Sequence, residues 1–588
     1  MGENLMSNYD KNPFIKVKNI DKESAWEGYD NIIGEIKERI KTIDKTVKIV
    51  SIDCYPGVRI DELREKLVGR LKPALVIFTD EAVFENSSRI IEKTQLMMTE
   101  DRVFGKMCLY NYEDFIDSEK LNSIKVQIEA CKGLIIIIGA AADMVAEADV
   151  YIFADLARWE ILNRYRKNEI SNWKAENLNE EYLLKYKRGY FFEWRMADRY
   201  KARRFNKMQY VLDTNTAGNP KMITGEVFRK GLKQTLEQPF RVVPFFDPSV
   251  WGGQWMKRVC GLDQEEENYG WCFDCVPEEN SLLLKVEDII VEIPSIDLVL
   301  RHPAELLGKK VYSRFGAEFP IRFDFLDTME GQNLSLQVHP LTDYIKNTFG
   351  IQYTQDESYY ILDAKEGASV FLGFKNNLNK EEFKRDLHRA QEEGVIFPHE
   401  KYVNEFPAKK HDHFLIPAGT IHCSGKDTMV LEISATPYIF TFKLWDWGRL
   451  GLDGRPRPIH LKHGEQVLQF ERDMDWVAGN LVNRISNFQQ QEGYRCETTG
   501  LHELEFIETI RYWIKDSVAL KSEGSVNVLN LVEGEEAIVT SPSGCFADFI
   551  VHYAETFIVP AHISEYVISP HGPSAGREIA VIRAYVRT

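Results

Sequence analysis

Short apolar runs alternate with amphipathic segments through the first 240 residues. The runs VKIVSIDCYP (47–56), ALVIFTDE (74–81), GLIIIIGA (133–140) and DVYIFAD (149–155) each end in a turn or at acidic residues. The first run leads directly into RIDELREKLVGRL, which has the spacing of an amphipathic helix. Apolar strands that alternate with helices are typical of a parallel sheet covered by helices. The pattern therefore predicts an α/β domain over residues 1–238.

From about residue 240 the pattern changes to short β-rich runs separated by Gly, Pro and Asp turns. One amphipathic segment, NKEEFKRDLHRAQEEG (379–394), predicts a helical insertion between two groups of strands. Near the terminus, VNVLNLVEGEEAIV and ETFIVPAHISEYVIS predict a second β-module. The fold class expected is multidomain, with the α/β domain followed by all-β domains over 239–465 and 466–588.

Charge and composition narrow the choice of partners. The net charge of −17 argues against a general nucleic-acid-binding protein. The longest apolar run, GLIIIIGAAA (133–142), has about half the length that a membrane-spanning helix requires. The polar start MGENLMSNYDKN lacks a signal-peptide core, and nine scattered cysteines indicate a reducing compartment. We expect a cytoplasmic protein without a nucleic-acid or membrane partner, and nothing in the sequence indicates its oligomeric state.

The turn in IDCYPGVRID (52–61) lies where a phosphate-binding loop would follow the first strand. In this layout the N-terminal half resembles nucleoside-kinase-like proteins. The turn lacks the G-x-x-x-x-G-K-[ST] pattern, including the lysine that would reach the phosphates. We therefore predict a kinase-like domain without kinase activity, and an active phosphotransferase on a sugar or nucleoside is the alternative.

A basic and aromatic segment follows over 158–207. Its spacing fits long helices whose charged side chains form either a solvated face, which we favour, or an anion-binding lid. A surface for single-stranded nucleic acid is a third interpretation. The cations concerned are Arg164, Arg166, Lys187, Arg195, Arg199, Arg203 and Arg204.

Metal chemistry is indicated for the second half, because all thirteen histidines lie between His302 and His571. In LSLQVHP (334–340) two polar side chains share one face of an apolar strand, and burying them requires partners. Downstream, one carboxylate opens the next strand, and PAGTIH delivers another imidazole. Two imidazoles, a carboxylate and an amide oxygen suit catalytic zinc, and ligands on separate strands of a barrel would converge inside it. The candidate ligands are Gln337, His339, Glu357 and His422.

A family resemblance rests on an ordered set of motifs over roughly 240–588. This part of the chain resembles the class I mannose-6-phosphate isomerases, which are zinc enzymes of the cupin superfamily. The resemblance implies Gln337, His339, Glu357 and His422 as ligands of Zn²⁺, a sugar phosphate as substrate, and a second jelly roll at the C-terminus. The motifs are VWGG, AELLG, FPIRFDFLDTMEGQNLSLQVHP, DESYYILDAKEGASVFLGF, IPAGTIH and LWDWGRLGLDGRPRPIH.

Several charged positions depart from the family pattern. In TFKLWDW, Lys443 stands where the family carries an arginine, so that the charge is kept and the planar fork is lost. Gln355 and Asp324 stand where many members have a lysine. A glutamate that precedes an early tryptophan in the family is missing from NYGWC.

An aldose–ketose isomerase needs an acid–base group and cations for the phosphate. Glu432 follows His422 by ten residues, an even spacing that places both on one strand face if the strand is unbroken. It is the acid–base candidate, with a structural hydrogen-bonding role as the alternative. Arg449 and Arg457 flank the turn at 453–454 and are candidates for phosphate binding or for plain surface positions.

We predict a zinc-dependent isomerase that interconverts mannose 6-phosphate and fructose 6-phosphate or a related sugar phosphate. Lys443 and Glu432 are its candidate catalytic residues. The alternative from another class is a cupin that binds a sugar or sugar phosphate without turnover and has a regulatory role.

Overall fold

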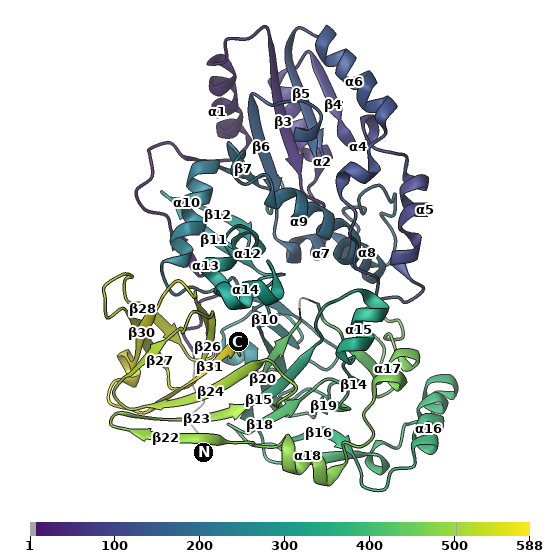
Figure 1. The fold of residues 1–588 in the computed structure, drawn as a ribbon, viewed down its shortest axis with the longest axis vertical. Helices are drawn as coiled ribbons and strands as arrows, with labels where there is room; N and C mark the ends of the chain where they lie inside the picture. The colour runs from purple at the N-terminus through teal and green to yellow at the C-terminus, as the bar shows by residue number, and fades with distance from the viewer. Residues whose placement is uncertain (1–6, 437, 501, 588) are drawn as a thin grey trace. The chain divides into compact units, whose positions relative to one another are not determined.

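The apolar runs of the N-terminal half form a seven-stranded sheet in the computed structural model, which describes residues 7–436, 438–500 and 502–587 (Figure 1). The strand order is β2-β8-β7-β6-β3-β5-β4, and the neighbours from β4 to β7 are parallel. The predicted parallel sheet is therefore present, and each of the four runs contains a strand. The strands are β2 (Ala25–Glu27), β3 (Val47–Cys54), β4 (Leu75–Phe78), β5 (Gly133–Gly139), β6 (Val150–Asp155), β7 (Tyr210–Asp213) and β8 (Lys221–Thr224).

Burial on both faces explains the apolar composition of these strands. In β5, Ile135, Ile136, Ile137 and Ile138 are all inaccessible to solvent, as expected for a strand between two helical layers. The segment after β3 is helical as predicted, with a π-helical turn over Arg64–Val68. The helices are α1 (Tyr29–Lys41), α2 (Ile60–Leu63), α3 (Gly69–Leu71), α4 (Thr79–Ala82), α5 (Ser87–Met98), α6 (Ser118–Ala130), α7 (Arg158–Arg166), α8 (Tyr182–Arg188), α9 (Trp194–Ala202) and α10 (Gly225–Leu236).

A segment near the middle of the sequence completes this part of the fold. Residues Phe14–Thr235 and Ser281–Arg301 form one compact unit, here called the α/β unit, and the other described residues form the β-rich unit. The inserted segment supplies β11 (Ser281–Val286), β12 (Ile289–Pro294) and α12 (Ile296–Arg301). Strand β11 pairs in parallel with β1 (Phe14–Lys16) and antiparallel with β12. The three-domain boundaries stay predictions.

The first half of the β-rich unit is built from two sheets. One has the order β18-β15-β20-β13-β10-β9 and the other β17-β16-β19-β14-β21. The predicted helical insertion is present as α16 (Lys380–Glu393), between β16 and β17. The strands are β9 (Phe245–Asp247), β10 (Trp271–Cys275), β13 (Arg322–Asp327), β14 (Leu336–Val338), β15 (Asp356–Ala364), β16 (Ser369–Phe374), β17 (Val403–Pro407), β18 (His413–Ile416), β19 (His422–Ser424), β20 (Thr428–Ala435) and β21 (Phe442–Trp445).

A second pair of sheets forms the predicted C-terminal β-module. Its six-stranded sheet runs β22-β23-β24-β31-β26-β29, and its four-stranded sheet runs β25-β30-β27-β28. Leu529, Leu531, Val539, Val551 and Tyr566 belong to the apolar core of this module. The strands are β22 (Ser486–Gln491), β23 (Tyr494–Gly500), β24 (Ile507–Ile514), β25 (Val518–Lys521), β26 (Asn527–Glu533), β27 (Glu536–Thr540), β28 (Phe549–His552), β29 (Thr556–Val559), β30 (Glu565–Pro570) and β31 (Ile579–Val586).

Short helices connect the strands of the β-rich unit. Across the described part of the chain, no helix combines the length and the apolar composition needed to cross a membrane. The helices are α11 (Trp255–Val259), α13 (Pro303–Leu307), α14 (Lys309–Phe315), α15 (Thr342–Phe349), α17 (Leu461–Val467) and α18 (Met474–Asn480).

Candidate metal centre

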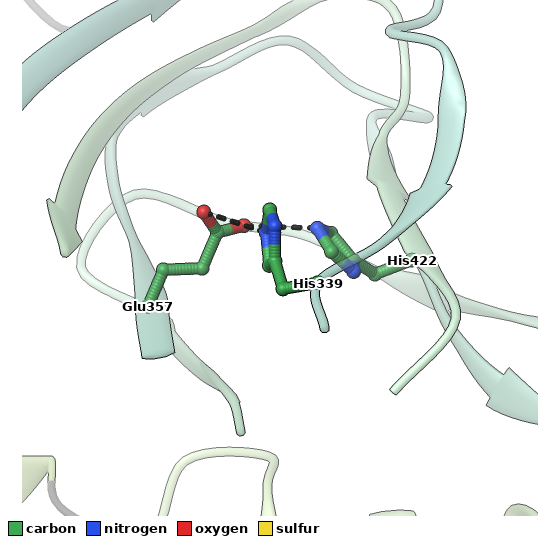
Figure 2. A group of neighbouring side chains, drawn as sticks. All are labelled: His339, Glu357 and His422. Carbon is green, nitrogen blue, oxygen red and sulfur yellow. Dashed lines mark ion pairs between the residues drawn. The ribbon is translucent and has the colours of Figure 1, made fainter. Parts of the chain in front are cut away.

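The candidate metal ligands come from both sheets in the first half of the β-rich unit. Gln337 lies on β14, and His339 follows directly after the last residue of that strand. His422 opens β19 opposite Gln337 in register, so that their side chains share one face. Glu357 lies on β15 of the other sheet. His339, Glu357 and His422 are at most 1% exposed, and Figure 2 shows the two imidazoles directed toward the carboxylate.

The donor atoms of these three residues are close enough to share one ion. Nε2 of His339 lies 3.0 Å from Glu357 Oε2, and Nε2 of His422 lies 2.9 Å from Glu357 Oε1. All candidate ligand atoms of the three residues lie within 4.8 Å of one another. The Gln337 amide is adjacent, with its Nε2 at 3.2 Å from His422 Nε2, and a rotation of this amide would present its oxygen instead.

Backbone carbonyls determine which ring nitrogen of each histidine faces the centre. Nδ1 of His339 donates to the Phe440 carbonyl at 2.9 Å, and Nδ1 of His422 donates to the Thr420 carbonyl at 2.9 Å. In a neutral imidazole the other nitrogen then carries a lone pair. Two such lone pairs face the carboxylate oxygens of Glu357, an arrangement that needs a cation or added protons between them. Two imidazoles and a carboxylate with carbonyl-bonded Nδ1 atoms are a donor set that fits Zn²⁺.

Electrostatics within the cluster favour an ionised carboxylate. Burial opposes the charge on Glu357, but the neighbouring imidazoles of His339 and His422 hold its pKa well below its usual range. Burial also lowers the pKa of His422, which favours the neutral imidazole that binds metals.

A row of acidic and hydroxyl groups lines the same interior beside the metal centre. Glu432 on β20 lies opposite Asp324 on β13 and opposite Tyr359 on β15. Tyr359 and Glu357 are two residues apart on one strand, so that this row faces the same side as the metal ligand. Burial raises the pKa of Glu432 well above its usual range, and the charges of Glu357 and Asp324 raise it further. Arg322 donates to Asp324 at 3.2 Å from the same strand.

The structure corrects how Glu432 reaches the site. An even spacing places Glu432 and His422 on one face only in an unbroken strand, whereas the chain turns between β19 and β20, with Asp427 in the left-handed region at φ 63°. The two strands belong to different sheets, so that Glu432 and His422 enter the interior from opposite sides.

Lys443 is a direct neighbour of a candidate ligand. It lies on β21 in register with Gln337, on the strand flank opposite to that of His422. Its side chain is half-buried. The register places the Lys443 side chain on the same sheet face as that of Gln337.

Arg449 and Arg457 meet at one aspartate on the loop after β21. Arg449 Nη2 lies 2.6 Å from Asp446 Oδ1, and Arg457 Nη1 lies 3.0 Å from Asp446 Oδ2. Ser335 also donates to Asp446, at 2.8 Å. The two arginines thus form one cluster with a buried carboxylate. Their phosphate-binding role stays a prediction.

Two residues near the metal centre were not among the predicted site residues. Gln355 donates from Nε2 to Glu357 Oε2 at 2.9 Å, and the Tyr359 hydroxyl is buried next to the same carboxylate. The even spacing of 355, 357 and 359 was a signal for both.

In the α/β unit, the basic segment forms internal contacts rather than a solvated face. Arg164 and Lys187 are at most 5% exposed, because their charges are bonded to carbonyl and carboxylate groups of the unit. Arg204 pairs with Asp143 at 3.0 Å. The favoured interpretation of a solvated face is therefore wrong for these residues. Arg166 and Arg203 are the exceptions, because both are exposed, and Arg203 pairs with Glu113.

The same helices hold the loop at the position expected for phosphate binding. Arg164 donates to the Gly57 carbonyl at 2.8 Å, and Tyr55 donates to Asp198 at 2.8 Å. A Cβ atom at Gly57, which has φ +104°, would lie 2.8 Å from Ile161. Side chains of α7 and α9 thus pack directly against this turn.

Comparison with known proteins gives a family model and several named relatives. A family model described as a domain of unknown function (DUF8485) matches residues 28–237. The probable mannose-6-phosphate isomerase GmuF of Bacillus subtilis is 23% identical over 333 residues, which cover 57% of this chain and 96% of that protein. The mannose-6-phosphate isomerase of Streptococcus mutans is 25% identical over 291 residues, which cover 49% of this chain and 83% of that protein.

Solved structures of proteins with the same name align with the chain. The mannose 6-phosphate isomerase from Bacillus subtilis aligns with 59% of this chain and 99% of its own, at 20% identity and a TM-score of 0.48. A putative mannosephosphate isomerase from Archaeoglobus fulgidus aligns with 59% of this chain and 98% of its own, at 17% identity and a TM-score of 0.42.

Proposed function

We propose that the chain is a zinc-dependent aldose–ketose isomerase that interconverts mannose 6-phosphate and fructose 6-phosphate or a closely related sugar phosphate. The observation that carries the proposal is the buried convergence of two imidazole Nε2 atoms on the Glu357 carboxylate, with both Nδ1 atoms bonded to backbone carbonyls. Support also comes from relatives named mannose-6-phosphate isomerases, of whose length the alignments cover 83% or more.

In this proposal His339, Glu357, His422 and Gln337 hold the zinc ion. Bound there, Zn²⁺ would polarise the sugar oxygens next to the carbon atoms that exchange a proton. Glu432 takes the proton from one carbon and returns it to the other. Its burial beside Asp324 favours this role, because a carboxyl with a raised pKa serves as acid and as base near neutral pH. Lys443 stabilises negative charge that develops on a sugar oxygen.

We place the substrate phosphate at the cluster of Arg449 and Arg457. The Asp446 carboxylate pairs with both guanidinium groups and can hold them in position for an anion. Charge-assisted bonds from arginine are well suited to phosphate.

In the α/β unit we propose a kinase-like domain without phosphotransferase activity. Side chains of α7 and α9 bond to the turn after β3, and the lysine that would bind a phosphate there is missing. The nine free cysteines support a cytoplasmic location.

A second candidate is a cupin that binds a sugar without turnover. The ion pairs of the nearby arginines favour this candidate. Arg449 and Arg457 pair with Asp446, and Arg322 pairs with Asp324, so that carboxylates of the chain itself neutralise these cations. Such a protein would hold the metal and the sugar and leave both unchanged.

The test is a coupled assay of fructose 6-phosphate formation from mannose 6-phosphate. We expect turnover by zinc-loaded protein, loss of turnover after chelation, and recovery when zinc is restored. His339→Ala should abolish turnover and zinc binding, whereas His388→Ala, which changes a histidine whose side chain is 47% exposed on α16, should leave both intact. Zinc binding without turnover on any sugar phosphate would favour the second candidate.

A further inference from the structure

Gln355 lies just before β15 and is 4% exposed, although it carries a polar amide. A buried amide without partners is costly, so both ends of the side chain need hydrogen bonds. Its Oε1 accepts from the Phe440 backbone N–H at 2.7 Å, and its Nε2 donates to Glu357 Oε2 at 2.9 Å. The amide has only one orientation that fits, because a backbone N–H can only donate.

The same peptide group of Phe440 reaches a second candidate ligand. Its carbonyl accepts from His339 Nδ1 at 2.9 Å, while His339 Nε2 lies 3.0 Å from Glu357 Oε2. Glu357, Gln355, Phe440 and His339 therefore form a closed circuit. One side chain and one residue's backbone set both the carboxylate orientation and the tautomer of the imidazole.

Phe440 belongs to the segment that leads into β21. Lys443 follows three residues later and lies in register with Gln337. The hydrogen bonds of this circuit therefore link the candidate ligands His339 and Glu357 to the segment that leads into β21, the strand of Lys443. A hydrogen-bonded partner behind a ligand orients it and raises its affinity for the metal.

We propose that Gln355 is a positioning residue that couples metal binding at His339 and Glu357 to the order of the segment carrying Lys443. The inference rests on the metal centre of the proposed function. When a cation restrains His339 and Glu357, the circuit restrains the Phe440 peptide, and the following residues lose local freedom. Without Gln355 the carboxylate loses its orienting donor, and the Phe440 N–H loses its acceptor.

The test compares Gln355→Met with the unchanged full-length protein. Methionine has nearly the same volume but has no donor and only a weakly accepting sulfur. Titration with Zn²⁺ should show a Kd about 10–100-fold higher for the variant. Hydrogen–deuterium exchange of a peptide covering residues 438–445 should slow on zinc addition in the unchanged protein and stay unchanged by zinc in Gln355→Met.

A matched control removes another buried amide from the same unit. Asn530→Leu changes a fully buried residue whose Nδ2 donates to the Ala554 carbonyl at 3.0 Å in the C-terminal module. It should lower thermal stability but leave the zinc Kd and the zinc-dependent exchange unaltered. If the role of Gln355 were purely structural, Gln355→Met would behave like Asn530→Leu: thermal stability would fall, and the zinc Kd and the zinc-dependent exchange would stay unaltered.

Two outcomes would overturn the inference. One is a Gln355→Met protein with unchanged zinc affinity and full zinc-dependent protection of residues 438–445. The other is an unchanged protein that binds zinc without any protection of that peptide, a result that decides the question even if the variant fails to fold. Failure of the unchanged protein to bind zinc would overturn the metal centre itself, and this separates it from failure of the coupling.

Discussion

Glu432 illustrates how its neighbours determine the protonation of a single buried carboxyl group. Its side chain is 4% exposed between Asp324 and Tyr359, so the interior contains two facing carboxyl groups that cannot both ionise at low cost. Its role as a candidate was accessible from the sequence. Its route to the site was not, because the turn between β19 and β20 depends on the pairing of distant strands.

Substitution of Glu432 tests the proton-transfer role. Glu432→Gln keeps the volume and removes the titratable group, so kcat should fall by about 10²–10⁴-fold. Zinc affinity should change little, because the residue is not a proposed ligand. Glu565→Gln, at an exposed position of β30, is the matched control and should retain full activity. Steady-state kinetics that leave Glu432→Gln at the unchanged rate would contradict the assignment.

His413 provides a residue-level test of stability against pH. Burial lowers its pKa from 6.5 to about 3, so the folded protein holds it neutral while the unfolded chain binds a proton below about pH 6.5. The native state therefore binds fewer protons in this range, and stability falls as pH falls from 6.5 toward 3. At pH 5 the titration of His413 should lower the free energy of unfolding by about 2 kcal/mol.

The measurement is chemical unfolding of the full chain at pH 5 and pH 7. His413→Asn removes the titrating ring, so the difference in unfolding free energy between the two pH values should shrink by about 2 kcal/mol. Equal pH dependence of both proteins would show that His413 does not titrate on unfolding.

At the level of elements, the apolar runs were sufficient to predict β3, β4, β5 and β6, because strands buried on both faces are continuously apolar. The helix α16 was equally predictable from its amphipathic pattern. The burial of the basic segment was not, because each cation finds a partner that lies far away in the sequence. Arg164, for example, bonds to carbonyls at positions 57 and 214.

Lys201 on α9 is the clearest case of such a buried cation. It is 1% exposed between Asp155 at the end of β6 and Asp297 on α12, and it forms ion pairs with both. Lys201→Met would leave two buried carboxylates without their cation, and we expect a loss of about 3–5 kcal/mol in the stability of the α/β unit. Urea unfolding followed by tryptophan fluorescence would measure it.

Lys45→Met is the comparison variant, since the Lys45 side chain is 64% exposed in its pair with Asp149. We expect little change, because exposed ion pairs contribute little. If both variants lose the same stability, burial is not what makes the Lys201 cluster important.

For the whole molecule, the sequence predicted an α/β part followed by β-sheets, but not how the chain is shared between them. Residues 281–301 return to the α/β unit, where β11 pairs with β1 and Asp297 pairs with Lys201. No local pattern reveals this, since β11 and β12 resemble the strands of the β-rich unit in composition. The candidate ligands were predictable because their residue types are unusual in apolar strands, whereas the hydrogen bonds of Gln355 to Glu357 and to the Phe440 backbone required the structure.

The central claim is that the buried centre at His339, Glu357 and His422 serves sugar isomerisation. The most direct measurement is proton NMR of mannose 6-phosphate incubated with the zinc-loaded protein in D₂O. We expect fructose 6-phosphate to appear, with deuterium entering at the carbon atoms that exchange the proton. An unchanged spectrum, from protein shown to contain zinc and to be folded, would contradict the isomerase assignment.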